Sequence, residues 1–566
     1  MRPLFPARGK TFQHLALLLL ATALLLGTSL VRMSLMPHDE GNYAAESRFM
    51  FNTGEWLARR WWNDITYSHG ILLNWLMLVG YSLFGVSDRV ARLPSVLACL
   101  SAVVLTYDIG KTLFASQPWG LGLDCDRFPR RLAFIAAFLL LVTSLWAQYG
   151  HLATQDMLLV SVELLGIWAL LRAEQNRSGA RLLFGFIAGL CFGLGYLVKT
   201  FMIFLPVLAL LPYLFFQHKR HRHLSNPGLY AGLLAGIAAV ALWIGLSIRE
   251  YGREIVLGSM FGKLGELSGE SFHPDGGPLY YLWNIPANMF PWALFALIGA
   301  VMVLRSSSFW SGFSMRGVSK AFTVTGPVYP HRWLLLYPFI LAGLLTLFPT
   351  KTPYYTLQLH PFMAFFAAIA LHRIAIQKKR WPRRWLSYSF AALGAIAAIL
   401  ALIALITPFV LTPTPELITE IAPYAPLALP LGIGWATLPV FMNRPGKWLA
   451  TWILPAWLAL SIAGLTGLLG NYSPEMKAAL GDEPIASVIE SYPVDFFLGA
   501  DWKPEDHKNM ILLSVYSPRI GRLNPPLDDV LPGTYAWASP NADPNPLDGR
   551  PFDTVTELDG WRLIRF

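Results

Sequence analysis

Residues 71–86, ILLNWLMLVGYSLFGV, decide how this chain is threaded. The stretch is apolar but short, because a helix needs about 20 residues to cross the hydrocarbon of a membrane. If it crosses, the basic residues Lys111, Arg127, Arg130 and Arg131 fall outside the cell. If it is a helix lying in the membrane surface, this cluster and the later basic loops all fall on the cytoplasmic side. We therefore predict an interfacial helix.

Apolar runs of spanning length occur on both sides of this stretch. The first run, residues 12–36, is too long for the apolar part of a cleaved signal peptide and lacks a clear cleavage site, so we expect a retained helix. It follows Arg2, Arg8 and Lys10, which predicts a cytoplasmic N-terminus. The other predicted spans are 90–108, 131–150, 157–173, 181–198, 200–217, 228–248, 285–304, 333–350, 354–372, 385–411, 425–442 and 448–470. The total of about 13 spans is odd and places the C-terminus outside.

The composition supports an α-helical polytopic membrane protein. Of 566 residues, 55% are hydrophobic and 14% are charged, whereas soluble globular proteins have about 25% charged residues. The same figures argue against disorder, coiled coils and collagen. Three cysteines (Cys99, Cys125 and Cys191) are too few and too scattered for a disulfide framework or a CxxC metal site. The net charge of +10 combines an acidic C-terminal part with a positive excess in the first 470 residues. This excess lies in short loops between apolar runs, so we expect no nucleic-acid partner.

The character of the chain changes at about residue 471. Pro, Asp, Asn and Gly become frequent, and short β-prone pieces appear, such as Met510–Tyr516 and the closing TELDGWRLIRF. We predict a small α/β domain over residues 471–566, outside the membrane. Residues 1–470 would form the transmembrane domain, with an outside loop at 37–89 that carries interfacial helices.

Charged residues at the outside ends of the predicted spans are the candidate site. Asp39 and Glu40 directly follow the first span, and Asp156 begins another. Acids in such places either cap helices or need water or a partner. Lys199 and Lys351 each end an apolar run; a single interfacial lysine usually snorkels, but two on the same face as three acids would suit the phosphate of a lipid-anchored ligand.

Signatures of soluble enzymes are absent from the sequence. It has no GxxxxGK[ST], no nucleotide-binding GxGxxG after a strand, no HExxH and no GxSxG. This argues against a nucleotide-driven transporter. A secondary transporter or lipid flippase stays an alternative, although those proteins use charges near the bilayer midplane and often show inverted repeats, and no repeat is visible here.

Five segments occur in an order that is typical of one enzyme family. They are Asp39–Tyr43 (DE-x-x-Y), Asp156–Leu159 ([TD]DMLL), Leu197–Lys199 (L-x-K), His273 with Tyr280-Tyr281 and Pro291-Trp292 (H…YY…PW), and Lys351–Tyr355 (K-x-P-x-Y). From about residue 30 to 375 the chain resembles the membrane glycosyltransferases of the GT-C superfamily. Within it, the chain is similar to the group that joins the family 39-like protein O-mannosyltransferases to the bacterial aminoarabinose transferases that modify lipid A.

The resemblance implies a glycosyltransferase in the inner membrane of a bacterium, with its C-terminal domain in the periplasm. It would move a sugar from a polyprenyl (undecaprenyl) phosphate to a lipid, glycan or protein acceptor, with inversion. The implied catalytic residues are Asp39 as general base, with Glu40 and Asp156 shaping the cavity. Those implied for binding the lipid phosphate or the sugar are Tyr43, Arg48, His69, Lys199, Lys351 and Tyr355.

One departure from the family concerns a metal ion. Aminoarabinose transferases carry an E-K-P-P segment where this chain reads Thr66-Tyr67-Ser68-His69-Gly70, so the glutamate that would partner His273 in holding a divalent metal is missing. His69 is more like the start of the H-P-P-L version in the mannosyltransferase branch. The resemblance therefore leaves a bound divalent metal open, with His273 as its ligand, and leaves the sugar open as well.

Overall fold

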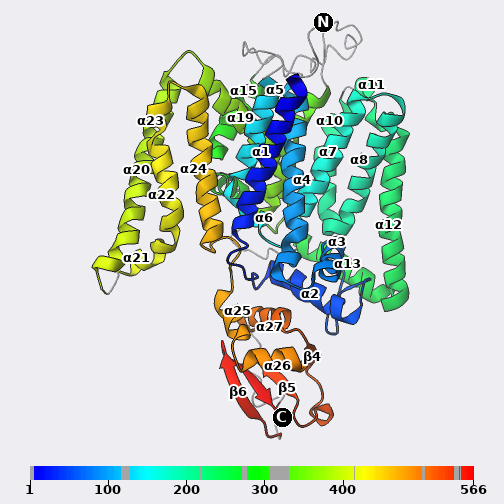
Figure 1. The fold of residues 1–566 in the computed structure, drawn as a ribbon. Coiled ribbons are helices and arrows are strands. Elements are labelled where there is room, and N and C mark those ends of the chain that lie inside the picture. The colour runs from blue at the N-terminus through cyan, green and yellow to red at the C-terminus, as the bar shows by residue number, and fades with distance from the viewer. Residues whose placement is uncertain are drawn as a thin grey trace.

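The structure is a computed structural model, and it describes residues 6–115, 128–216, 218–269, 277–305, 330–412, 415–499, 504–540, 547 and 550–566. A body of roughly parallel helices makes up most of the molecule, and a small sheet domain projects from one end of it (Figure 1). The first described residues, at the start of α1, lie at the opposite end of the body from this domain.

The first half of the helical body contains most of the segments named above. Its elements are α1 (Pro6–Thr28), α2 (Asp39–Thr53), β1 (Arg59–Trp61), β2 (Asp64–Thr66), α3 (Leu72–Phe84), α4 (Asp88–Ala115), α5 (Phe128–Leu141), α6 (Ser144–Gly150), α7 (Gln155–Gln175), α8 (Ser178–Lys199), η1 (Thr200–Ile203), α9 (Phe204–Ala209), α10 (Leu211–Phe215), α11 (His218–His221), η2 (His223–Ser225), α12 (Pro227–Tyr251) and α13 (Arg253–Gly269).

The second half completes the body and adds an arm of long helices on one side (Figure 1). Its elements are α14 (Tyr280–Asn288), α15 (Trp292–Leu304), η3 (Pro330–Leu336), α18 (Tyr337–Leu347), η4 (Pro353–Leu359), α19 (His360–Ile376), α20 (Trp381–Val410), α21 (Glu416–Ile421), η5 (Ala422–Tyr424), α22 (Ala425–Ala436), α23 (Leu438–Phe441) and α24 (Pro445–Leu465).

Helices that can cross a membrane dominate the described part of the chain. Eight helices there are long and apolar enough, or up to 10 if each of two bent pairs counts as one span. The bent pairs are α5–α6, with an angle of 69°, and α14–α15, with an angle of 114°. The chain is thus a multi-spanning membrane protein, but the predicted number of about 13 spans is not confirmed. Predicted spans 200–217 and 333–350 correspond to short helical pieces, and α7 carries four charged residues.

The predicted interfacial stretch forms α3, which has 13 residues and is too short to cross a membrane. It packs beside α2, and both lie at the end of the body that carries the sheet domain (Figure 1). Which end faces the cytoplasm stays a prediction that rests on the basic loops.

The C-terminal residues form a five-stranded mixed sheet with the order β4-β3-β5-β7-β6. Strand β3 pairs in parallel with β4 and β5, and β7 pairs antiparallel with β5 and β6. The elements are α25 (Pro474–Gly481), α26 (Ile485–Ser491), β3 (Val494–Phe497), α27 (Pro504–Tyr516), β4 (Ile520–Leu523), η6 (Leu527–Asp529), β5 (Tyr535–Ala538), β6 (Asp553–Leu558) and β7 (Trp561–Arg565). The closing TELDGWRLIRF forms the β6–β7 hairpin.

The prediction of a strand at Met510–Tyr516 is wrong, because this segment belongs to helix α27. Met510, Ile511, Leu512 and Leu513 are all buried. A helix that is covered on several sides carries a continuous apolar run, and such a run cannot be told from a buried strand by periodicity. Helix α27 lies between the sheet and α2, which explains the burial.

The sheet domain and the helical body share one hydrophobic cluster. Leu35, Ala44, Ala45 and Trp62 belong to the helical body, and they pack in the same cluster as the apolar residues of α25, α26 and α27 and the strands β3, β5 and β7. The Trp62 indole donates a hydrogen bond to the Gly521 carbonyl at 2.8 Å. The contact between the two parts is therefore a continuous core.

We expect His507 to make this contact sensitive to pH. Its ring lies edge-on to Trp61 with 5.5 Å between the centroids, and burial, with the nearby His38, lowers its pKa below 6.5. As the pH falls through 6.5, the unfolded chain takes up a proton that the folded chain resists, so folding loses stability. We expect the melting temperature to decrease as the pH is lowered from about 8 to about 5.5, and to decrease less in the His507→Gln variant. Equal falls in both proteins, measured by intrinsic fluorescence, would contradict this.

Candidate active site

A polar cavity brings together residues from five separate parts of the chain. It is lined by Asp39, Tyr43, Ser68, His69, Thr154, Asp156, Lys199, Thr200, Met202, Tyr354 and Tyr355. At about 60 Å³ it is smaller than a typical ligand pocket of about 300 Å³ or more, so it can hold the reacting groups of a substrate but not a whole lipid-linked sugar.

Asp39 is the first residue of α2, at the mouth of the cavity. Its side chain is exposed, and it accepts no hydrogen bond from any residue that the structure describes. Asp39 and Glu40 occupy the first turn of this helix, where the positive end of the helix dipole favours acidic side chains. The result is a water-accessible carboxylate held on a rigid element.

Asp156 and Lys199 form a buried ion pair across the cavity. Asp156 is the second residue of α7 and Lys199 is the last residue of α8, and each is 8% exposed. The Lys199 ammonium donates a hydrogen bond to Asp156 Oδ1. It also lies 4.8 Å from the ring centroid of Tyr354 and 5.2 Å from that of Tyr355. The two aromatic faces and the carboxylate fix the position of this charge.

Tyr43 forms one wall and is packed from behind. Its ring lies edge-on to His69, with centroids 6.2 Å apart, and the Arg59 guanidinium lies 5.3 Å from its centroid. Arg59 in turn donates to Glu46 at 2.7 and 2.8 Å, which balances its buried charge. Burial raises the pKa of Tyr43 well above 10, so its hydroxyl stays protonated and can donate a hydrogen bond to a ligand.

Gly70 allows the segment with His69 to approach α8. A Cβ atom at this position would lie 2.3 Å from the carbonyl oxygen of Leu197 and 2.5 Å from the backbone of Val198. The Gly70 carbonyl also accepts a hydrogen bond from the Gln155 side chain at 2.6 Å. Glycine at this position therefore keeps His69 beside the Asp156–Lys199 pair.

We expect Gly70→Ala to destabilise the protein by about 1–3 kcal/mol, because backbone atoms on both sides must move apart. The matched control is Gly245→Ala in α12, where an added methyl group meets nothing within 4 Å. Thermal unfolding of the two variants in detergent would check this. A melting temperature for Gly70→Ala at or above that of Gly245→Ala would contradict the tight approach.

Glu40 lies behind the cavity instead of lining it. It is fully buried and accepts hydrogen bonds from Arg92 at 2.5 and 2.7 Å and from the backbone N–H groups of Met36 and Ala153, both at 2.9 Å. Arg92 also donates to the carbonyls of Gly470 and Ser34, at 2.7 and 2.8 Å. This network joins the start of α2 to the segment before α7, so it fixes Asp39 relative to Asp156.

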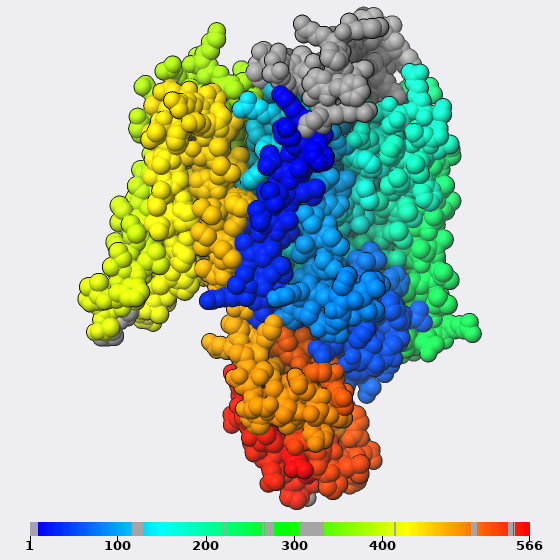
Figure 2. All heavy atoms as spheres, in the orientation of Figure 1, coloured from blue at the N-terminus to red at the C-terminus, as the bar shows by residue number. Residues whose placement is uncertain are grey.

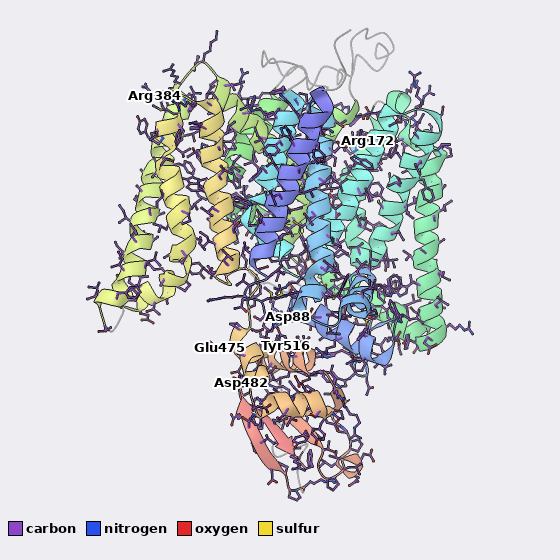
Figure 3. All side chains as sticks on the ribbon, in the orientation of Figure 1. Asp88, Arg172, Arg384, Glu475, Asp482 and Tyr516 are labelled. Atoms are coloured by element: carbon purple, nitrogen blue, oxygen red, sulfur yellow. The ribbon has the colours of Figure 1, made fainter. Side chains whose placement is uncertain are left out.

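Two other predicted residues, Arg48 and Lys351, do not line the cavity. Arg48 donates to the Val515 carbonyl and lines a separate cavity of about 220 Å³ at the sheet domain, next to Asp88 and Tyr516 (Figure 3). Lys351 is 6% exposed and donates to the Phe348 carbonyl at 2.8 Å. His273 lies outside the described residues. The cavity thus brings together Asp39, Tyr43, His69, Asp156, Lys199 and Tyr355 of the predicted set.

The sequence contained signals for some residues that we did not predict. Arg92 lies within the predicted span 90–108, and an arginine inside a span usually marks a functional or structural partner. Tyr354 adjoins the predicted Tyr355. Thr200 has a left-handed backbone conformation, with φ 43°, that no sequence pattern indicates.

The described residues do not provide a metal site of ordinary composition. No group of three or more His, Cys, Asp or Glu among them is arranged to hold a metal ion. Asp156 is already paired with Lys199.

Comparison with known proteins gives a consistent result. A family model described as dolichyl-phosphate-mannose-protein mannosyltransferase matches residues 125–244. A curated undecaprenyl phosphate-alpha-4-amino-4-deoxy-L-arabinose arabinosyl transferase of Pseudomonas aeruginosa is 27% identical over 285 residues, which are 50% of this chain and 49% of that protein. A second one, from Pseudomonas fluorescens, is 31% identical over 42% of this chain and 38% of its own length. The chain thus spans about half the length of the curated relatives it matches, or less.

Solved structures match over nearly the whole chain. The crystal structure of ArnT from Cupriavidus metallidurans bound to undecaprenyl phosphate has a TM-score of 0.67 and 19% identity, covering 97% of both chains. The apo structure of the same protein also has a TM-score of 0.67, covering 99% of this chain. The predicted resemblance is confirmed: this chain has the GT-C fold and is similar to the bacterial aminoarabinose transferases and, over residues 125–244, to the mannosyltransferase family.

Proposed function

We propose that this protein is a bacterial inner-membrane glycosyltransferase that moves a sugar from undecaprenyl phosphate to an acceptor hydroxyl at the periplasmic face. The observation that carries the proposal is the cavity in which Asp39, Asp156 and Lys199 meet at the ends of α2, α7 and α8. The names of the similar arabinosyl transferases support the donor class, as does the fold shared with a protein solved with undecaprenyl phosphate.

Asp39 is the proposed general base. The acceptor oxygen attacks the anomeric carbon while its proton passes to the Asp39 carboxylate, and the bond from that carbon to the phosphate oxygen breaks. The electron pair leaves with the phosphate, so undecaprenyl phosphate is the second product. A single displacement inverts the configuration at the anomeric carbon. Exposure of Asp39 suits this role, because the acceptor has to reach it from water.

Lys199 is the proposed partner of the leaving phosphate. Negative charge develops on the phosphate as its bond to the sugar breaks. A fixed, buried cation stabilises this charge without reorganisation of the site. The pair with Asp156 holds the Lys199 ammonium in place, and this ammonium keeps further N–H donors for a ligand. Tyr355 and Tyr43 would position the sugar. Lys351 as a second phosphate partner, and His273 as a metal ligand, remain predictions.

Reconstitution tests the proposal directly. The full chain in vesicles is supplied with undecaprenyl phosphate that carries a radiolabelled sugar, together with a bacterial envelope extract as the source of acceptors. We expect a labelled product and stoichiometric release of undecaprenyl phosphate. Movement of the labelled lipid between leaflets with no glycosidic bond formed would overturn the proposal in favour of a flippase.

A further inference from the structure

A groove on the membrane-facing surface lies far from the cavity described above. Helices α1, α5 and α24 form it, and its volume is about 460 Å³, which is within the range of ligand sites. Figure 2 shows α1 in blue and α24 in yellow-orange, with cyan atoms of α5 between them toward the N-terminal end of the body. The lining is apolar except for Arg131, and consists of Leu17, Leu20, Ala21, Leu24, Arg131, Phe134, Ile135, Phe138, Gly446, Leu449, Ala450, Ile453, Leu454 and Trp457.

The polar end of the groove is cationic. Arg131 lies in the first turn of α5, and its Nη2 atom is 3.8 Å from where a Cβ of Gly446 would lie, so the guanidinium reaches the first turn of α24. Lys447 is the next residue of α24 and is also exposed; it does not line the groove, and its ammonium lies 5.8 Å from the centroid of the Phe441 ring. Neither side chain forms an ion pair with another described residue, and Asp and Glu are absent from the lining.

The other end of the groove is apolar. Trp457 lines it there and donates a hydrogen bond from its indole to the Ala21 carbonyl of α1 at 3.1 Å. From Gly446 to Trp457, α24 rises by about 17 Å, at about 1.5 Å per residue. This is close to half the thickness of the hydrocarbon region, about 15 Å. The groove therefore extends from the surface on the N-terminal side to about the middle of the membrane.

We propose that this groove binds one anionic glycerophospholipid from the leaflet on the N-terminal side of the membrane. Its phosphate would lie at Arg131, with the neighbouring Lys447 adding positive charge, and an acyl chain would lie along Leu17, Leu20 and Ala450. The charge of the open end selects an anionic head group, since cations near the membrane surface attract such lipids. The depth fits a lipid of one leaflet and not a chain that crosses both. The cavity with Asp39 opens at the opposite end of the body, so this site is separate from catalysis.

Native mass spectrometry of the full chain, released from detergent with added lipid, tests the proposal. The probes are phosphatidylglycerol, which is anionic, and phosphatidylcholine of the same chain length, which has no net charge. We expect one phosphatidylglycerol to be retained in preference to phosphatidylcholine. Each of Arg131→Gln and Lys447→Gln should weaken this retention by about fivefold. Ala450→Trp fills the groove without changing the charge and should abolish the preferential retention of phosphatidylglycerol.

The matched control is Arg384→Gln, which removes an exposed cation from α20 at the same end of the molecule (Figure 3) and should leave retention unchanged. Equal retention of the two lipids would overturn the proposal and leave the groove as an ordinary contact with bulk lipid. The proposal would also be overturned if the Arg131, Lys447 and Ala450 variants retained phosphatidylglycerol as well as the parent protein does. Both substituted cations lie on the surface, so the variants should fold normally, and an unchanged melting temperature would verify this.

Discussion

The Asp39→Asn variant is expected to transfer sugar about 10²–10⁴-fold more slowly than the parent protein, because an amide cannot take the proton of the acceptor in the displacement step. The substitution preserves size and leaves the start of α2 intact, and the structure shows no hydrogen bond to this side chain from a described residue that would be lost. The measurement is the initial rate of labelled product formation in vesicles at saturating donor.

Glu416→Gln is the matched control for this variant. Glu416 is an exposed acid at the start of α21, at the same end of the molecule as Asp39 (Figure 1), and its loss should leave the rate unchanged. Binding of undecaprenyl phosphate should also persist in Asp39→Asn. A variant that transfers at the parental rate would remove Asp39 as the base, and a variant that no longer binds the lipid would point to a role in binding.

The Glu40→Gln variant is expected to lose about 3–5 kcal/mol of stability, because it leaves the buried Arg92 guanidinium without its counter-charge. Arg92 is 2% exposed, so water cannot replace the carboxylate. Thermal and denaturant unfolding would measure the loss. Transfer should fall as well, since Glu40 fixes the segments that carry Asp39 and Asp156.

Two variants sharpen this test. Glu475→Gln changes an exposed acid of α25 and should change stability by less than about 0.5 kcal/mol. Glu40→Gln combined with Arg92→Met removes both charges and should regain part of the lost stability, because the unpaired cation is gone. If Glu40→Gln melted like the parent protein, the network around Glu40 could not be holding the site together.

Much of the candidate site could be predicted from the order of its residues. Asp39, Asp156 and Lys199 each mark the end of an apolar run, and such ends meet at one surface of a helical bundle whichever helices are neighbours. If residues 71–86 form an interfacial helix and do not cross the membrane, these three ends are predicted to lie on the same side of the membrane. Packing partners were not predictable in this way, and Glu40 could not be distinguished from Asp39 because the buried Arg92 comes from another helix.

Helical geometry separates Arg48 from Asp39, although both were predicted as site residues. It lies nine residues after Asp39 on α2, and at about 100° per residue the two side chains point to opposite sides of the helix. Tyr43, four residues after Asp39, stays on the same side. Lys351 had no such signal, since its position depends on how α18 ends and on the turn into η4.

The cluster in which Leu35, Ala44 and Ala45 pack with α27 has a consequence for any attempt to divide the chain. Cutting the chain near residue 471 would expose the apolar residues of this cluster on both fragments. Helix α2, which carries Asp39, would then lose its packing against α27. The C-terminal domain is therefore a support that packs against the helical body, and it is not a detachable module.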